Sequence, residues 1–193
     1  MKHRWRVLGV AFFTFFVAGS FSVHAETPSW TVVKDQSFIS FAGTQTGNPF
    51  EGRFETFEVD IQFDPNEPAS AQVSASIDSG SALTGDTQRD EALPGKDWFN
   101  IVEFPSISFR ASGFQKIGPN DFITDGVLTV LGVDHSLSLP FQLTIEGTQA
   151  RMEADITLDR QILGIGKGPW AEGKWVGLDV NVKIRIQATR ATP

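Results

Sequence analysis

Apolar and polar residues alternate with a period of two through most of the chain, and this alternation constrains the fold more than any other feature. The clearest run is residues 137–145, in which every odd-numbered residue is apolar. Successive side chains of a strand point to opposite faces, so such a run predicts a strand with one buried face. Comparable runs occur at 30–33, 39–42, 57–63, 73–77, 107–109, 122–132, 152–158 and 176–186. The pattern predicts about eight or nine strands joined by short turns.

Antiparallel strands in this number are expected to close into a barrel, which removes the exposed edges of an open sheet. A barrel of about eight strands has an interior that side chains fill or that holds one elongated ligand. Small residues interrupt the bulky inward positions, and we expect them to leave room inside. They are Ala75, Gly126, Gly132 and Ala154. A filled sandwich core remains the alternative interpretation of the same composition.

The strand pattern is broken at one place, Leu83–Phe109. Asp86 is a suitable N-cap for a short helix that Pro94 must end, because proline lacks an N–H and clashes with the preceding turn. Trp98 and Phe99 follow in a segment too short to bury them by itself. We therefore predict a short helical insert at about 86–100 that acts as a lid on the barrel.

The first 25 residues have the features of a secretory signal peptide. A basic start is followed by the apolar run Val7–Ala18 and by the small-residue cleavage site Val23-His24-Ala25. Cleavage there predicts a mature domain of residues 26–193 that begins at Glu26. An uncleaved membrane anchor is the alternative, although the apolar run is short for a bilayer span.

Charge and cysteine content exclude several classes of function. Residues 1–25 hold three of the 16 basic residues and none of the 23 acidic ones, so 13 basic and 23 acidic residues remain, a net charge of −10. Such a charge argues against nucleic acid and anionic lipid surfaces as partners. The chain has no cysteine, which excludes disulfides and thiolate metal sites.

No catalytic or metal-binding set is found. His135 is the only histidine after the signal, so a site with several histidines cannot form, and we expect His135 on the surface at the start of a strand. The glycines at 164, 166 and 168 resemble a phosphate loop, but Pro169 occupies the place of the third glycine in that motif, and the run is interpreted as a turn. Three arginines beside inward positions are either solvated or polar contacts of a ligand: Arg53, Arg89 and Arg160.

A set of motifs in fixed order resembles the YceI family over Trp30–Ala188. The most specific are D-W-F-N…F-P-S-I-S-F at 97–109 and G-V-L-T-V-L-G-V at 126–133. The others are S-x-I-S-F at 37–41, G-R-F-x-x-F at 52–57, I-Q-F-D-P at 61–65, R-D-x-x-L at 89–93, L-x-L-P-F at 137–141, L-D-R at 158–160 and G-I-G-K-G-P-W at 164–170. The last motif is similar to the branch that also occurs fused to cytochrome b561-type membrane domains.

The resemblance implies an all-β, lipocalin-like antiparallel barrel in the periplasm that holds a polyisoprenoid or an isoprenoid quinone. On this basis we expect a lipid carrier that is no enzyme and has no metal or other cofactor. An accessory that presents quinone to a cytochrome b561-type partner is the alternative, and an enzyme acting on a lipid head group is a weaker one. The sequence leaves open whether the chain forms a homodimer.

The expected ligand contacts follow from the inward positions. The tunnel would be lined by Phe41, Phe57, Ile61, Phe109, Leu128, Leu139, Phe141 and Ile156. Its mouths would be gated by Trp98, Phe99, Trp170 and Trp175. Arg53, Arg89 and Arg160 are the candidates for contact with a polar head group.

Overall fold

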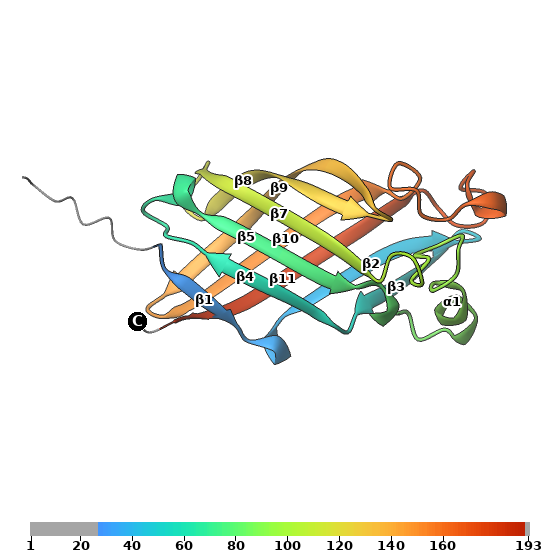
Figure 1. Cartoon of the computed structure of the whole chain (residues 1–193), viewed down its shortest axis with the longest axis horizontal. Coiled ribbons are helices and arrows are strands. Elements are labelled where there is room, and N and C mark those ends of the chain that lie inside the picture. Colours follow the sequence, from blue (N-terminus) through green and yellow to red (C-terminus); the bar gives the residue numbers. More distant parts are fainter. Residues whose placement is uncertain (1–26, 192–193) are drawn as a thin grey trace, which may run out of the picture.

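Eleven β-strands form one continuous antiparallel sheet in the computed structural model, which describes residues 27–191 (Figure 1). The strands are β1 (Ser29–Val32), β2 (Phe38–Gln45), β3 (Asn48–Phe54), β4 (Phe57–Gln62), β5 (Gln72–Asp78), β6 (Ala82–Leu83), β7 (Ser106–Lys116), β8 (Asp121–Val130), β9 (Val133–Glu146), β10 (Gln149–Asp159) and β11 (Asp179–Arg190). The signal peptide predicted for residues 1–25 lies outside the described residues.

Eight of these strands close into a barrel in the order β1-β4-β5-β7-β8-β9-β10-β11, because β1 pairs with both β4 and β11. The predicted all-β, antiparallel barrel of about eight strands is therefore confirmed. The remaining strands β2, β3 and β6 continue the sheet from β11, with Phe41 opposite Val182 and Gly52 opposite Phe41. Closure leaves the ends of the barrel as the places where a ligand can pass.

The helical elements are few and short. The α-helix α1 spans Thr87–Ala92, and the 3₁₀ turns are η1 (Lys34–Gln36), η2 (Pro68–Ser70), η3 (Ser79–Ser81) and η4 (Gly168–Trp170). The Asp86 side chain accepts a hydrogen bond from the Arg89 backbone N–H at 3.0 Å, which confirms Asp86 as the N-cap. Within residues 27–191, none of the helices combines the length and apolar character needed to cross a membrane.

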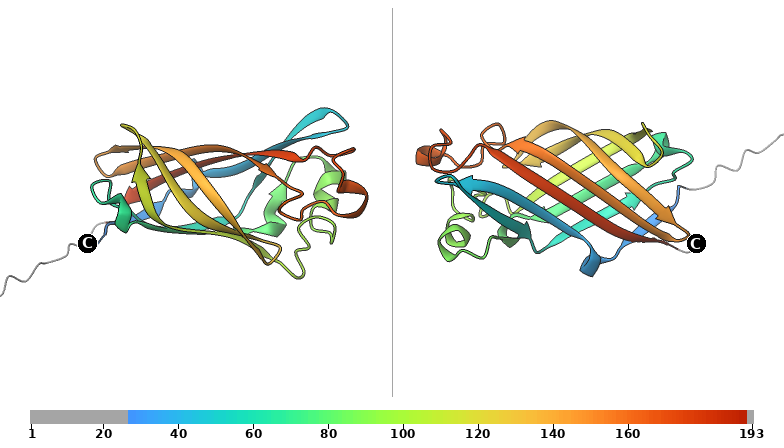
Figure 2. Two further views of the ribbon diagram at one scale, coloured as in Figure 1. Left: turned by 90° about the horizontal axis from the view of Figure 1, so that it is seen from above. Right: turned by 180° about the vertical axis from the view of Figure 1, so that it is seen from behind.

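The two ends of the barrel differ. At the end that holds β1 and the β9–β10 turn, the wall is fully paired: Trp30 lies opposite Arg190 and Ile61, and Gln149 lies opposite Glu146 and Thr189. At the other end β9 and β10 no longer pair, because their ladder stops at Gln142 and Glu153. The wall consequently flares toward α1, as the view from above shows (Figure 2).

Three segments gather over the flared end, which we call the mouth. They are the tip of the β2–β3 hairpin, the segment 84–105 that contains α1, and the loop 160–178 between β10 and β11 (Figure 1). The buried apolar residues among residues 27–191 form two clusters, one at each end of the barrel. One buried cluster includes Trp30 and Phe141 near β1, and the other includes Phe99 and Leu131 at the mouth.

Candidate functional site

A cavity of about 360 Å³ occupies the barrel interior, with inward side chains of most strands on its wall. Volumes of this order are typical of sites for small molecules. Among residues 27–191, and apart from tryptophan, the wall has five polar side chains, and all belong to the mouth or the segments over it: Gln45, Thr84, Gln88, Arg89 and Arg160. The cavity is therefore apolar along its length and polar at one end, the distribution that an amphiphilic molecule requires.

Aromatic rings close the end opposite the mouth. The Phe63 ring meets Phe114 and Phe122 edge-on, with centroids 5.8 and 5.7 Å apart. Phe141 stacks on Phe122 at 5.6 Å. Trp30 is buried there, and its indole Nε1 donates to the Phe63 carbonyl at 2.9 Å, so its one polar atom is satisfied. This closed end presents only hydrocarbon to the cavity.

Glycines in the wall accommodate aromatic rings rather than enlarging the cavity. A Cβ placed on Gly126 would lie 2.5 Å from the Phe109 ring, and one on Gly52 would lie 2.4 Å from the Phe41 ring. Gly132 lies in the β8–β9 turn with φ of +72° and not in the interior. The expectation that Gly126 and Gly132 leave room inside is therefore wrong. Ala75 does line the cavity, whereas Ala154 is buried in the cluster near β1.

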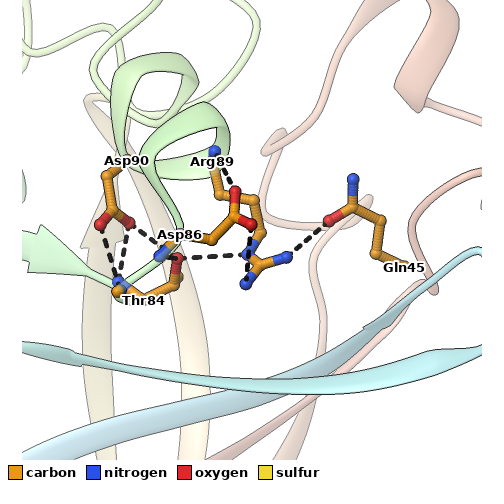
Figure 3. A network of polar contacts seen from close by, with 6 residues as sticks. Gln45, Thr84, Asp86, Arg89 and Asp90 are labelled. Atoms are coloured by element: carbon orange, nitrogen blue, oxygen red, sulfur yellow. Dashed lines mark hydrogen bonds and ion pairs between the residues drawn. The ribbon is translucent and has the colours of Figure 1, made fainter.

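Arg89 is the cation of α1 at the mouth (Figure 3). Its Nε donates to Thr84 Oγ1 at 3.2 Å and its Nη1 to Gln45 Oε1 at 2.9 Å, while its guanidinium lies 4.9 Å from the centre of the Phe50 ring. Its Nη2 has only the more distant contact with Asp86 Oδ2, at 3.9 Å. Arg89 is thus held in place by part of its donors and has others to offer a ligand.

Asp90 fixes the start of this segment. Its Oδ1 accepts from the Thr84 backbone N–H and from Thr84 Oγ1, both at 2.7 Å, and its Oδ2 accepts from the Gly85 N–H at 3.1 Å. Burial raises the pKa of Asp90, but these hydrogen bonds together with the Arg89 charge outweigh it and hold the pKa below its ordinary value. The carboxylate form therefore orients Thr84, which in turn positions Arg89.

Arg160 has a different role from the one predicted. It is 2% exposed, and all five of its N–H groups donate to backbone carbonyls of the loop 160–178. Nε reaches Gly177, Nη1 reaches Ile165 and Gly166, and Nη2 reaches Trp170 and Val176, at 2.5 to 3.3 Å. Burial lowers the pKa of the guanidinium, and the nearby Asp159 offsets this in part. Because all of its N–H groups already donate to carbonyls of the loop, Arg160 organises the loop and has no donor available for a head group.

The glycine-rich run wraps around this guanidinium. Gly164, Gly166 and Gly168 all have positive φ, and a Cβ on Gly166 would lie 2.2 Å from Arg160 Nη1. Only glycine satisfies both the backbone conformation and the close approach. The motif G-I-G-K-G-P-W is therefore a turn, as interpreted from Pro169, and the structure adds the reason for its glycines.

The predicted lid lies over the mouth and is fastened to the loop 160–178. The Asp97 carbonyl accepts from the backbone N–H groups of Gly166 and Lys167, both at 2.7 Å. Trp98 lies 5.8 Å from Trp170 between ring centres, and the Arg160 guanidinium lies 5.6 Å from the Trp98 ring. We call this set of contacts the latch. It joins the segment 84–105 to the loop, so neither can move away alone.

Most of the predicted ligand contacts lie on the cavity wall. These are Phe41, Ile61, Trp98, Phe99, Phe109, Leu128, Leu139, Phe141, Ile156 and Trp170, together with Arg89 and Arg160. Phe57 is not on the wall, although it packs against the buried cluster at the mouth. Trp175 is 47% exposed on the outside of the loop, and Arg53 is an outward residue that pairs with Glu55. Alternation along β3 puts Arg53 on the face opposite to Phe54, and Trp175 lies in a loop, so Phe57 is the one of the three that alternation could not separate from the wall residues.

The sequence did not point to Gln45, Thr84 and Gln88. Each is a common polar residue in or beside a turn or a short helix, with no motif around it. Only the folding of the β2–β3 tip against α1 brings them to the cavity. A search for polar residues flanking the helical insert would have found Thr84 and Gln88, but not Gln45.

His135 is half-buried and not a fully exposed surface residue. It lies near the start of β9, as expected, but on the same face as Leu137 and Leu139, and its Nε2 is shielded without a hydrogen-bond partner. Among residues 27–191, no three His, Cys, Asp or Glu side chains group in a way that could hold a metal ion.

Comparison with protein families gives one match. The model of the YceI-like domain matches residues 30–188, nearly all of the barrel. The chain belongs to the YceI-like family. The motif resemblance is thereby confirmed, including its extent.

Relatives and solved structures agree with this membership. YceI of Escherichia coli O6:H1 is 26% identical over 184 residues, which cover 94% of this chain and 84% of that protein. A UPF0312 protein of Enterobacter sp. (strain 638) is 27% identical with the same coverage. The crystal structure of BcnA from Burkholderia cenocepacia is 27% identical, covers 82% of this chain and all of that one, and superposes with a TM-score of 0.79.

A more distant structure shares the fold. It is described as a polyisoprenoid binding domain from Saccharophagus degradans, is 14% identical, and superposes with a TM-score of 0.66 over 86% of this chain and all of that one. The barrel fold is thus shared even at low sequence identity.

Proposed function

We propose that this protein is an exported, periplasmic carrier that holds a long isoprenoid lipid, either a polyisoprenoid or an isoprenoid quinone, inside its barrel. The observation that carries the proposal is the cavity, apolar from the aromatic rings near β1 up to a polar group of side chains at the mouth. Membership of the YceI-like family and the polyisoprenoid binding described for the Saccharophagus degradans domain support it.

The energetics favour a hydrocarbon chain in the interior. Burial of one methylene contributes about 0.8 kcal/mol, so an isoprene unit of five carbons contributes about 4 kcal/mol before the cost of ordering the chain. A tail of a few units therefore binds tightly with few polar contacts. The closed, wholly apolar end at Trp30 suits the tail, and the mouth suits the head.

The head group would meet Arg89, Gln45, Gln88 and Thr84. Arg89 and the two amides offer N–H donors, whereas the Thr84 hydroxyl is already donated to Asp90 and serves to hold Arg89 in place. Such donors fit an oxygen acceptor, for example the carbonyl of a quinone or the hydroxyl or phosphate that ends a polyisoprenoid. Binding and release are the whole activity in this proposal, and no chemical step on the lipid is included.

The test is analysis of the ligand that the protein retains when purified from its own periplasm. Native mass spectrometry should show a bound species, and solvent extraction should yield an isoprenoid lipid. Arg89→Met should retain less of this lipid, because the guanidinium that would contact the head group is removed. Arg53→Met is the matched control, since Arg53 lies outside the cavity. Recovery of a protein without any lipid would refute the carrier. Equal retention of a nonpolar ligand by both variants would refute the head-group site.

Presentation of a quinone to a cytochrome b561-type membrane partner is the finer form of this proposal. It is supported by the G-I-G-K-G-P-W motif, which resembles the branch fused to such domains. Quinone turnover in membranes with and without the protein would test it. Dimerisation stays a prediction for sedimentation analysis.

A further inference from the structure

Large apolar side chains are exposed at seven places in residues 27–191, and their distribution is uneven. They are Leu83, Val102, Ile117, Val127, Val133, Ile162 and Trp175, at 46, 91, 61, 41, 53, 71 and 47% exposure. Four of them lie at the mouth, three in its loops and one, Val133, at the start of β9. We call Val102, Val133, Ile162 and Trp175 the apolar rim.

Three members of the apolar rim lie on neighbouring segments. A Cβ on Gly132, next to Val133, would lie 2.8 Å from the Phe104 ring of the segment 84–105, which carries Val102. A Cβ on Gly164, in the loop that carries Ile162, would lie 3.6 Å from the Leu131 side chain. The chains bearing these side chains are thus in contact around one side of the mouth.

Trp175 extends the apolar rim toward the β2–β3 hairpin. The Thr46 backbone N–H donates to the Trp175 carbonyl at 2.7 Å, and the Lys174 ammonium lies 5.2 Å from the Trp175 ring centre. A half-exposed tryptophan beside a lysine is the combination found where proteins meet the interface of a bilayer, with the ring among the lipids and the ammonium at the phosphates.

The charge of the loop 160–178 fits the same surface. Outside its buried Arg160, this loop has exposed Lys167 and Lys174 against Glu172, although the chain as a whole has 23 acidic and 16 basic residues. Lys167 and Lys174 can meet the phosphates of phospholipids, whereas the segment 84–105 has five acidic and two basic residues, so the attraction is confined to the loop. The acidic remainder disfavours deep or strongly charge-driven attachment.

We infer that the apolar rim docks on the surface of a phospholipid bilayer, placing the mouth of the cavity against the membrane. This inference rests on the proposed function, since it gives an apolar ligand a path that avoids water. Insertion of apolar side chains drives the docking, and the lysines orient it. Binding is therefore shallow and reversible, and it does not require anionic lipid.

Flotation with phosphatidylcholine vesicles tests the inference, with thermal unfolding as the check that each variant folds. The double variant Val102→Ser/Ile162→Ser should bind about a hundredfold more weakly, about tenfold for each side chain removed from the lipid interface. Ile117→Ser is the matched control. Ile117 is as exposed as the rim residues but lies in the β7–β8 turn at the opposite end of the barrel, so binding should not change.

Several results would overturn the inference. They are no flotation of the wild type with phosphatidylcholine, binding only when phosphatidylglycerol is added, or an equal loss in Ile117→Ser. A dimer of the wild type without vesicles that becomes a monomer in the double variant would make the apolar rim a self-interface instead. Extraction of the same lipid from the double variant as from the wild type separates this test from that of the carrier, because neither substituted residue lies on the cavity wall.

Discussion

Replacement of Arg160 by methionine should loosen the loop 160–178 while the barrel stays folded. The guanidinium donates five hydrogen bonds to carbonyls of this loop and is 2% exposed. Methionine fills a similar volume but leaves all five carbonyls without these donors. Each buried acceptor left without its donor costs about 1–3 kcal/mol, so losing even two or three of the five bonds costs about 3–5 kcal/mol. We expect this cost to appear as local opening, because the five carbonyls belong to one loop.

Hydrogen exchange measures the effect directly. The amides of Gly166 and Lys167, which donate to the Asp97 carbonyl, report on the latch. A loss of about 3–5 kcal/mol corresponds to exchange faster by about two to four powers of ten, since each 1.4 kcal/mol is a factor of ten. Amides of β8, which belong to the paired wall, should exchange at the wild-type rate.

Two further variants separate geometry from charge. Arg160→Lys keeps the charge but has three donors on one atom, so it should loosen the loop nearly as much as methionine. Gly166→Ala should do the same from the other side, because its Cβ would collide with Arg160 Nη1. The double variant Arg160→Met/Gly166→Ala should be less destabilised than the sum of the two single changes. Wild-type protection in Arg160→Met, or full protection in Arg160→Lys, would refute the role assigned to this arginine.

Three other perturbations have definite expected outcomes. The pKa of Asp90 is depressed in the folded protein. Its contribution to the order of α1 is therefore complete above the ordinary carboxylate pKa and is lost as the pH falls through the depressed value. In Asp90→Asn, hydrogen exchange of α1 should lose this acid dependence. Phe141→Glu should prevent folding as well as ligand retention, because Phe141 stacks on Phe122 in the closed end. Thr144→Glu, on the outer face of β9, should be tolerated. A soluble Phe141→Glu variant that still binds lipid would show that the inward face of β9 is assigned wrongly. Removal of the lipid should speed hydrogen exchange across 88–103 and the loop 160–178 together, with β11 barely changed. Trp98→Ala should speed ligand loss more than it lowers thermal stability. Equal protection with and without lipid would show that Trp98 is an ordinary core residue.

The barrel was predictable because the alternation that defines each strand involves only neighbouring residues. Alternation along residues 137–145 decides which face of β9 is buried, and the same holds for each strand that pairs along its length. The helix could be predicted for a similar reason, since Asp86 and Pro94 act on their immediate neighbours. Neither prediction needs knowledge of distant contacts.

The mouth was less predictable because its contacts are between distant segments. Arg53, Arg89 and Arg160 all stand beside apolar positions in the sequence, yet one is solvated, one faces the cavity and one is buried in its own loop. What separates them is the number of acceptors that the folded chain places around each guanidinium. Phe57 was expected on the wall from alternation, which gives the side of a strand but not what packs over it. Trp175, expected as a gate of the mouth, lies half-exposed in the loop 160–178, where no alternation applies.

The position of the latch makes ligand release and membrane contact a single problem. The closed end is sealed by Trp30 and its neighbouring rings, so a ligand must leave past Trp98 and Trp170. The latch is made of two backbone hydrogen bonds and ring contacts, few enough for local opening without unfolding the barrel. Three of the four residues of the apolar rim, Val102, Ile162 and Trp175, lie on the two segments that the latch joins. A bilayer that binds Val102 and Ile162 therefore acts on both sides of the latch, and it favours opening only if the open arrangement buries more of the apolar rim than the closed one does.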